Sequence, residues 1–351
     1  MNENFDINNQ EVAEEAEVNE PIRTVTREPY GLNEESFKER REIRLISRLA
    51  SLSFITLLVV SYVLATVLFY ALLIFGFSYD KASGLLSDPY FQQFFQIAAS
   101  SLMFIVPFAF FFKCGGYKIS KIINFNLPKA KNWFPIVLMG VGFCSFANMA
   151  VTIAGSFFER FGINYDVDFG ENPTGTFGII LTVISTAVIP PLVEEFACRG
   201  ILLGSLRKFG DGFAIMVSSI LFGAIHGNFQ QAPFAFLIGL IMGFITVKCN
   251  SIWPAILIHA YNNLVSVVCD YLFVDLLVNM QNIIYTFYLV ICLLIGIVGL
   301  VFLKNDTDTF KLTPSNTSAK TKQKYKWFFT TELVIITLIM CFIGALRYFV
   351  M

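Results

Sequence analysis

Charged residues are scarce in this chain: Asp, Glu, Lys and Arg make up only 15% of its 351 residues, against roughly a quarter in soluble domains. Hydrophobic residues make up 56%, and the mean hydropathy is +0.65. So few charges argue against a soluble globular domain, and the chain has none of the basic surface that a nucleic-acid-binding protein needs. The composition predicts an integral membrane protein.

Several motifs of known chemistry are also missing. No pair of the seven cysteines has CxxC spacing, and all seven lie in or beside apolar runs, which indicates small buried hydrophobes rather than a disulfide framework. No HExxH motif places two histidine ligands for zinc one helical turn apart, and no Ser–His–Asp arrangement is apparent. Histidine occurs only twice, at His226 and His259.

The first twenty residues contain seven acidic residues and no basic one. Such a stretch cannot bury enough apolar area to offset its ordering entropy, so residues 1–45 are predicted to form a disordered acidic tail. The first apolar run begins near Leu49 and is too long for a signal-peptide core, so no cleavage is expected. The expected domains are N-terminal transmembrane helices at 46–174, a catalytic core at 175–275, and C-terminal transmembrane helices at 276–351 with a basic loop at 304–326.

Nine apolar runs are long enough, or nearly so, to cross a hydrocarbon core, which needs about 20 helical residues. They lie near 49–77, 91–112, 133–157, 176–206, 212–228, 232–247, 252–274, 282–303 and 327–350. Gly227, Asn228 and Pro233 predict a tight helical hairpin between the fifth and sixth runs. The sequence thus predicts an all-α, polytopic bundle of about eight to nine spans.

Basic residues gather in alternate loops, while the loops between them are acidic or neutral. The basic segments precede the first span, separate the second from the third, follow the fourth and the sixth, and fill the loop after the eighth. Because positive residues favour the cytoplasm, the N-terminus is predicted to be cytoplasmic and the C-terminus to lie outside.

The fourth run contains three ionisable residues directly after Pro190 and Pro191: Glu194, Glu195 and Arg199. Each costs about 2.5–3.5 kcal/mol at mid-bilayer, even on a lenient scale. If the span ended at the prolines these groups would be hydrated, but the apolar stretch that follows them argues against that. Glu195 and Arg199 are one turn apart and are expected to pair. Glu194 has no partner at that spacing and is the candidate for chemistry.

The two histidines lie inside other apolar spans, where imidazole is costly to desolvate and is more often functional than in a soluble core. Asn263 shares a helix face with His259, whereas Asn262 is offset by about 100° and is expected to make a helix–helix contact. Counted at about 1.5 Å per residue from the basic loops, Glu194, His226, His259 and Asn263 all fall in one layer, roughly 15–22 Å deep.

These groups suit amide hydrolysis by activated water. A carboxylate in an apolar cavity can take a proton from water, an imidazole can orient that water or protonate the leaving amine, and a second imidazole with a carboxamide can stabilise the oxyanion. A zinc site made of Glu194, His226 and His259 with one open position remains an alternative, so zinc is the one cofactor to consider.

Three motifs resemble those of the CPBP family, which comprises the CAAX prenyl endopeptidases and bacterial proteins implicated in bacteriocin processing and self-immunity. They are Glu194-Glu195-x-x-x-Arg199, Phe222-x-x-x-His226 and His259-x-x-x-Asn263, in family order within 175–270. The resemblance implies a helical bundle with a cytosol-facing intramembrane cavity. It also implies that Glu194 and His226 activate water, that His259 and Asn263 stabilise the oxyanion, that Glu195 and Arg199 brace the site, and that Phe222 packs beneath His226. Family members are described both as metalloproteases and as metal-free glutamate proteases, and we favour the second.

The resulting hypothesis is an intramembrane endopeptidase of a bacterial plasma membrane. Its partners would be the bilayer and a peptide, a membrane-anchored protein or a lipidated tail, with no nucleic acid. One rival is a proton-coupled transporter, although the polar residues crowd into four spans without the matching second set typical of such folds. The other rival is a non-catalytic immunity or scaffold protein on the same fold.

Overall fold

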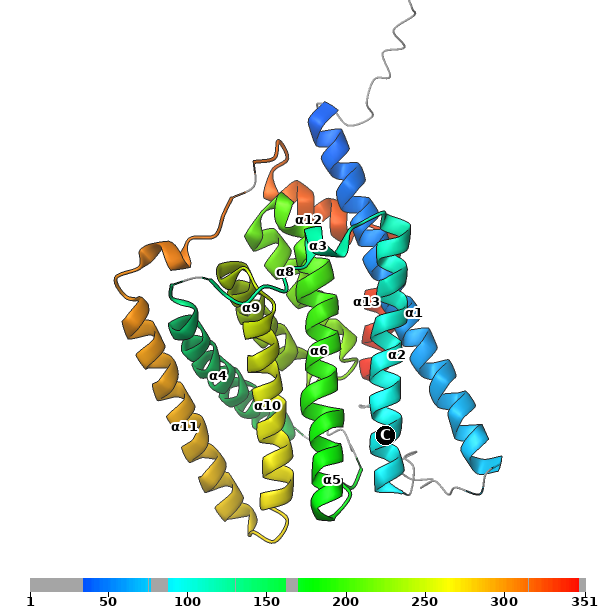
Figure 1. The fold of residues 1–351 in the computed structure, drawn as a ribbon, viewed down its shortest axis with the longest axis vertical. Helices are drawn as coiled ribbons and strands as arrows, with labels where there is room; N and C mark the ends of the chain where they lie inside the picture. The colour runs from blue at the N-terminus through cyan, green and yellow to red at the C-terminus, as the bar shows by residue number, and fades with distance from the viewer. Residues whose placement is uncertain are drawn as a thin grey trace, which may run out of the picture.

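The structure, a computed structural model, describes residues 34–74, 76, 88–129, 131–161, 170–314 and 316–346, and all regular structure in these ranges is helical (Figure 1). The α-helices are α1 (Glu34–Ile74), α2 (Pro89–Gly115), α3 (Ile119–Ile122), α4 (Trp133–Glu159), α5 (Gly175–Thr182), α6 (Ile189–Glu195), α7 (Gly204–Leu206), α8 (Asp211–Ile225), α9 (Ala232–Cys249), α10 (Trp253–Leu272), α11 (Val278–Leu303), α12 (Thr321–Phe329) and α13 (Glu332–Leu346). Two π-helical segments, η1 (Val183–Val188) and η2 (Phe196–Leu203), and two 3₁₀ turns, η3 (Arg207–Phe209) and η4 (Thr307–Phe310), complete the order.

Among the described residues, seven helices are long and apolar enough to cross a membrane, and there are eight if α12 and α13, which meet at a 69° bend, form one span. The helical membrane bundle predicted from the sequence is therefore confirmed. The fifth expected span, at 212–228, corresponds to α8, which has only 15 residues. Such a helix is roughly 22 Å long, short of a hydrocarbon core of about 30 Å.

The predicted hairpin between α8 and α9 is present. α8 ends at Ile225 and α9 begins at Ala232, so the turn falls where Gly227, Asn228 and Pro233 placed it. Gly227 has a φ of +61°, which glycine adopts without strain, and the buried Asn228 accepts a hydrogen bond from the Gln231 backbone N–H at 2.7 Å. The hairpin begins and ends at the same end of the bundle, since Arg207 before α8 donates a hydrogen bond to Asn250 after α9. The short α8 therefore leaves the alternation of the other helices unchanged.

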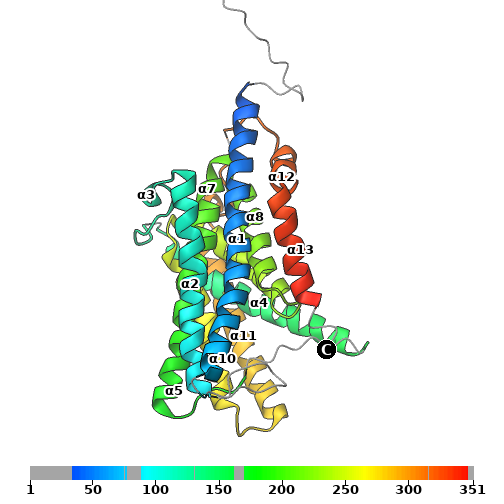
Figure 2. The same cartoon turned by 90° about the vertical axis from the view of Figure 1, so that its right-hand side faces the viewer.

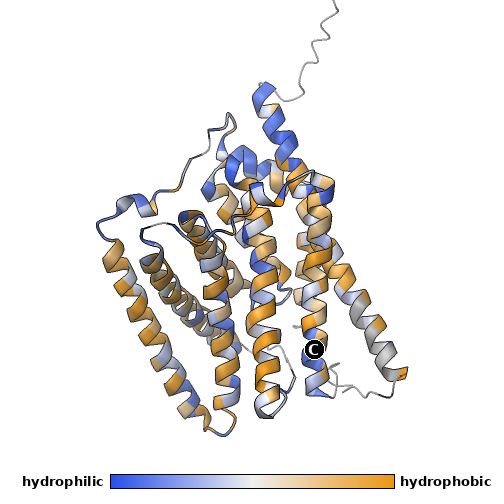
Figure 3. Ribbon diagram, in the orientation of Figure 1, coloured by the Kyte–Doolittle hydropathy of each residue, from blue (hydrophilic) through white to orange (hydrophobic). Residues whose placement is uncertain are grey.

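The polar segments gather at one end of the bundle. α3, α12 and the first turns of α1 lie together at the top of Figure 1, and the ribbon at this end is the most hydrophilic in Figure 3. The basic loops that were predicted to share one side of the membrane thus lie at a common end. That this end is cytoplasmic stays a prediction.

The helix α1 begins at Glu34, eleven residues before the expected end of the acidic tail at residue 45. Residues 34–45 are therefore helical, which corrects that boundary, while residues 1–33 lie outside the described residues. Glu39 accounts for this early start. Its buried carboxylate accepts hydrogen bonds from the backbone N–H groups of Ser318 at 2.8 Å and Ala319 at 3.0 Å, which fixes the first turns of α1 against the segment before α12. Figure 2 shows α13 continuing beside α1, where the two helices are in contact.

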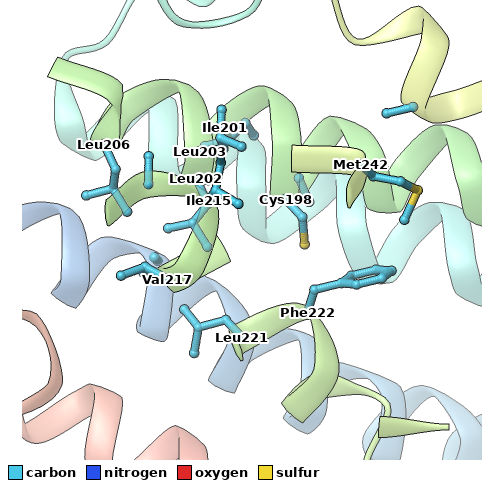
Figure 4. Close-up of a cluster of buried hydrophobic side chains, with 14 of the residues drawn as sticks. Cys198, Ile201, Leu202, Leu203, Leu206, Ile215, Val217, Leu221, Phe222 and Met242 are labelled. Atoms are coloured by element: carbon cyan, nitrogen blue, oxygen red, sulfur yellow. The ribbon is translucent and has the colours of Figure 1, made fainter. Parts of the chain in front are cut away.

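The centre of the bundle at this end is a dry apolar cluster formed by η2, α8 and α9 (Figure 4). Cys198, Ile201 and Leu202 of η2 are fully buried, as are Leu221 and Phe222 of α8. These elements carry two of the three sequence motifs. Their packing therefore fixes the backbone from which the candidate functional side chains project.

The long helices α4 and α11 approach each other closely at glycines. A β-carbon added at Gly296 would lie 2.5 Å from the Cα of Gly142, and one added at Gly299 would lie 2.6 Å from the backbone nitrogen of Met139. Close approach of backbones at small residues is a main source of helix association in membranes, where lipid offers no hydrophobic driving force between helices.

Replacing Gly296 by alanine should force α4 and α11 apart. We expect a loss of about 1–3 kcal/mol of stability, because backbone rather than a flexible side chain occupies the space. Unfolding of the purified protein in detergent measures this loss. Gly212→Ala is the matched control, since its added β-carbon would meet only a leucine methyl at 3.7 Å. Equal effects of the two substitutions would contradict the packing argument.

Candidate active site

The first motif lies in a helix of unusual construction. The segment Gly175–Phe209 forms one 35-residue span in which α5, η1, α6 and η2 follow one another. In η1, the backbone N–H of Ile189 bonds to the carbonyl of Ile184, five residues earlier. Such π-helical turns are rare and often occur at functional sites.

Two consecutive prolines leave one carbonyl of this helix without an internal partner. The carbonyl of Thr186 would accept from residue 190 in an α-helix and from residue 191 in a π-helix, but both are prolines and lack an N–H. The side-chain Nδ2 of Asn263 in α10 donates to this carbonyl at 3.0 Å. Asn263 therefore replaces a missing backbone hydrogen bond and joins α10 to η1.

Glu195 connects the first motif to the third. Its side chain is completely buried, and its Oε1 accepts a hydrogen bond from Nδ1 of His259 at 2.9 Å. Its Oε2 lies 3.1 Å from Nε of the equally buried Arg199, an ion pair in which the N–H does not point at the oxygen. The predicted pairing of Glu195 with Arg199 is thus present, and His259 shares the same carboxylate.

The ring of Phe222 is the hub around which the motif residues meet. This fully buried ring lies under the guanidinium of Arg199, at 4.1 Å from its Cζ to the ring centroid. The imidazoles of His226 and His259 approach it edge-on, with centroid separations of 5.0 and 5.9 Å. Arg199 thus gains a cation–π contact in place of water, since its Nη1 and Nη2 make no hydrogen bond to any residue that the structure describes.

Glu194 is more exposed than Glu195 and has no arginine partner in the part of the chain that the structure describes. Its side chain keeps 17% of its surface exposed, and its Oε2 makes no hydrogen bond to a described residue. That oxygen lies 3.9 Å from Nε2 of His259, the ring nitrogen on the opposite side from Glu195. Glu194 is therefore the more exposed of the two glutamates, and its Oε2 faces an imidazole without a hydrogen-bond partner among the described residues.

His226 directly follows the end of α8. The last carbonyls of a helix have no N–H partner within the helix and can accept other hydrogen bonds. Nδ1 of His226 lies 2.8 Å from the carbonyl oxygen of Phe222, and because a carbonyl can only accept, Nδ1 carries the proton. Asn228 donates to the carbonyl of His226 at 2.9 Å and so fixes the turn. The lone pair of His226 is therefore on Nε2.

The structure brings six of the seven predicted residues, which are Glu194, Glu195, Arg199, Phe222, His226 and His259, into one connected set of contacts, while the seventh, Asn263, lies one turn after His259 on α10 and bonds to the Thr186 carbonyl. Asn262, which was expected to contact another helix, accepts a hydrogen bond from Asn148 of α4 at 3.3 Å. Sequence reasoning missed the bond between Glu195 and His259 and the role of the Thr186 carbonyl. Only the second had a signal, in the prolines four and five residues after Thr186.

The residues present do not form a metal site. Within the described part of the chain, no three His, Cys, Asp or Glu side chains lie close enough together to hold an ion. Nδ1 of each imidazole donates to a protein acceptor, which leaves only Nε2 of each ring as a potential ligand. The set Glu194, His226 and His259, considered from sequence as zinc ligands, is not gathered as a coordination sphere.

Comparison with known proteins finds similarity over the segment that carries the site. A family model for type II CAAX prenyl endopeptidase Rce1-like proteins matches residues 176–265. The chain is also similar to "Putative membrane peptidase YdiL" of Bacillus subtilis (strain 168), with 29% identity over 117 residues, a match that covers 32% of this chain and 47% of that protein. The chain thus spans about half the length of this curated relative. No solved structure matches the chain.

Glu195→Gln should destabilise the fold strongly, because it removes the charge that compensates a buried guanidinium. Breaking such a buried pair costs about 3–5 kcal/mol. Denaturant or thermal unfolding in detergent measures the effect. Glu194→Gln is the matched control, an identical change one residue away at a partly exposed position, and it should change stability by about 0.5 kcal/mol or less. Similar losses in the two variants would show that Glu195 is not the structural member of the pair.

Proposed function

We propose, from the match of residues 176–265 to the family model for type II CAAX prenyl endopeptidase Rce1-like proteins, that the chain is an intramembrane endopeptidase that cleaves peptide bonds with water activated by Glu194. One observation carries the proposal. Of two adjacent glutamates on this helix, Glu195 is completely buried and paired with Arg199 and His259, whereas Glu194 is partly exposed and has Nε2 of His259 at 3.9 Å from its Oε2.

In the proposed reaction, Glu194 acts as the general base. It takes one proton from a water molecule while the water oxygen bonds to the carbonyl carbon of the substrate. The proton then passes to the amide nitrogen as the C–N bond breaks, which yields a carboxylic acid and an amine. The unprotonated Nε2 of His226 is suited to orient the water or to relay this proton, because Nδ1 is held by the Phe222 carbonyl.

His259 is suited to stabilise the oxyanion. With Nδ1 donating to Glu195, a second proton on Nε2 would give an imidazolium whose positive charge lies against a carboxylate. The Nε2–H would then point to the side occupied by Glu194, where the reaction takes place.

Asn263 is proposed to act at the same oxyanion with the part of its amide that the fold leaves free. A carboxamide has two N–H groups, and one of them already donates to the Thr186 carbonyl. The first bond fixes the orientation of the amide, and the second N–H is available to a substrate oxygen. The prolines would thus contribute to catalysis indirectly, by creating the carbonyl that holds Asn263.

The finer assignments follow from the sequence and are part of this proposal. The catalytic core is residues 175–275, the N-terminus is cytoplasmic, and the site opens to the cytosolic side of a bacterial plasma membrane. Its substrates are peptides or membrane-anchored or lipidated protein tails, which include the precursors that bacteriocin processing and self-immunity require. The C-terminal helices from residue 276 surround the core.

Glu194→Gln, His226→Ala and His259→Ala should each abolish cleavage, and Asn263→Ala should slow it by about 10²–10³-fold, the typical cost of losing one oxyanion donor. The measurement compares membrane peptides that accumulate in cells expressing the wild type or Glu194→Gln, followed by cleavage of the accumulated peptide with purified protein in liposomes. Glu194→Gln is near-isosteric, so equal protein abundance separates lost chemistry from lost fold.

The same experiment tests the rival functions. A transporter would lose proton-dependent uptake in the Glu194→Gln cells while the peptide pattern stayed the same. A scaffold or immunity protein would keep its cellular phenotype in that variant. Either result would contradict proteolysis.

Cleavage should persist after treatment with 1,10-phenanthroline, because Glu194, His226 and His259 do not lie close enough together to hold one ion. The assay is peptide cleavage by the purified protein with and without the chelator. Added Zn²⁺ should not raise the rate. Loss of activity on chelation, restored by Zn²⁺, would overturn the metal-free mechanism.

A further inference from the structure

A polar cavity lies at the basic end of the bundle. It has a volume of about 580 Å³ and is bordered by the segment around α3 and by the turn before α10. Its third wall is α7, near the end of the helix Gly175–Phe209, which carries the first motif and is called the motif helix below. This volume is within the range of about 300–1,000 Å³ typical of ligand sites. An adjoining cavity of about 330 Å³ shares Asn124, Asn126 and Asn250 with it.

The lining has the composition of an anion site. Three cationic residues, Lys121, Arg199 and Arg207, line the larger cavity, and no Asp or Glu does so among the described residues. Arg199 is paired with Glu195, and Arg207 is paired with Asp211 at 3.0 Å, so Lys121 supplies the cavity's cation that is outside these ion pairs. The amides of Asn124, Asn126 and Asn250 add neutral hydrogen-bond donors. Arg and Lys with amide donors are the groups that bind phosphate most strongly in proteins.

The cavity is a built feature rather than a gap between loops. The side chain of Asn124 donates to the backbone carbonyl of Asn250 at 2.6 Å. The backbone carbonyl of Asn124 accepts a hydrogen bond from the backbone N–H of Ile252 at 3.2 Å. Trp253 donates through its indole N–H to the carbonyl of Phe125 at 2.6 Å. Gly204 lets the carbonyl of Ile122 come so close that a β-carbon there would clash. The wall is thus tied to the bundle at several points.

The rim of the cavity is apolar. Ile119, Phe125 and Leu127 expose 46, 44 and 76% of their surface beside a cavity lined by polar groups. Five lysines and no acidic residue lie between positions 113 and 131. Apolar side chains alternating with lysines are typical of a segment that lies in the membrane interface, where anionic lipid headgroups are concentrated.

We propose that this cavity binds the phosphate of an anionic phospholipid headgroup, with Lys121, Arg207 and the three asparagine amides as the contacting groups. The cations and amides alone would serve any phosphate. The exposed apolar rim favours a lipid, because it places the cavity at the depth of the headgroups and leaves room for acyl chains beside it. The proposal does not depend on the proposed protease function.

Occupancy of the cavity bears on the candidate active site through the elements that form its wall. Arg199 lines the cavity and is also the partner of Glu195, while Ile252 directly precedes α10, which carries His259. A headgroup that bridges these segments holds η2 and the start of α10 together. Anionic lipid is therefore expected to raise the thermal stability of the protein.

The test uses the full chain purified in detergent. Thermal unfolding and native mass spectrometry are recorded with added phosphatidylglycerol, with phosphatidylcholine, and with inorganic phosphate. We expect bound phosphatidylglycerol and a higher melting temperature, with little effect of the other two. Lys121→Gln should weaken phosphatidylglycerol binding about fivefold, the effect expected for one cation near a lipid surface. Asn126→Ala should weaken it in the same direction.

Lys118→Gln is the matched control, because Lys118 is an exposed lysine of the same segment that does not line either cavity. Equal weakening by Lys118→Gln and Lys121→Gln would mean diffuse attraction to a charged surface and would overturn the site. Inorganic phosphate that matches the lipid in effect and competes with it would overturn the lipid assignment. Peptide cleavage is not a readout here, so these results are independent of the protease proposal.

Discussion

The structure depends most on one completely buried carboxylate. Glu195 lies between the guanidinium of Arg199 and the imidazole of His259, and both of its oxygens face a partner. A lone charge at this depth would cost several kcal/mol, so each member is tolerable only because the others are present. The pair also orients His259, since the Nδ1 bond turns Nε2 towards Glu194. A requirement of stability thus fixes the geometry on which the proposed chemistry rests.

A similar exchange occurs in the backbone. The prolines at 190 and 191 deprive the Thr186 carbonyl of its helical partners, and within a membrane such a group needs another donor. Asn263 supplies it from α10. The π-helical segments η1 and η2 lie on either side of the glutamate pair. The bond from Asn263 to the carbonyl in η1 holds two of the three motif-bearing helices in register.

The two faces of the motif helix have different surroundings. One side carries the Glu195 and Arg199 pair against Phe222, in a dry cluster with α8 and α10. Towards its end, the same helix borders a polar cavity with exposed apolar side chains on its rim. Arg199 belongs to both environments, which makes it the physical link between the site and the membrane interface. Coupling between them needs no moving part, because a shared side chain and a shared helix suffice.

The sequence by itself determined what depends on local chemistry. Apolar runs specified a membrane bundle, i,i+4 spacing specified the pair of Glu195 and Arg199, and Gly227 with Asn228 specified the hairpin. Tertiary structure decided the rest. The bond of Glu195 to His259 joins residues 64 positions apart, and no periodicity encodes that distance. Apolarity also cannot distinguish a helix wrapped by protein from one that crosses lipid, so α8 was counted as a span although it is too short. The start of α1 at Glu34 depends on a carboxylate that meets its backbone partners only in the folded bundle.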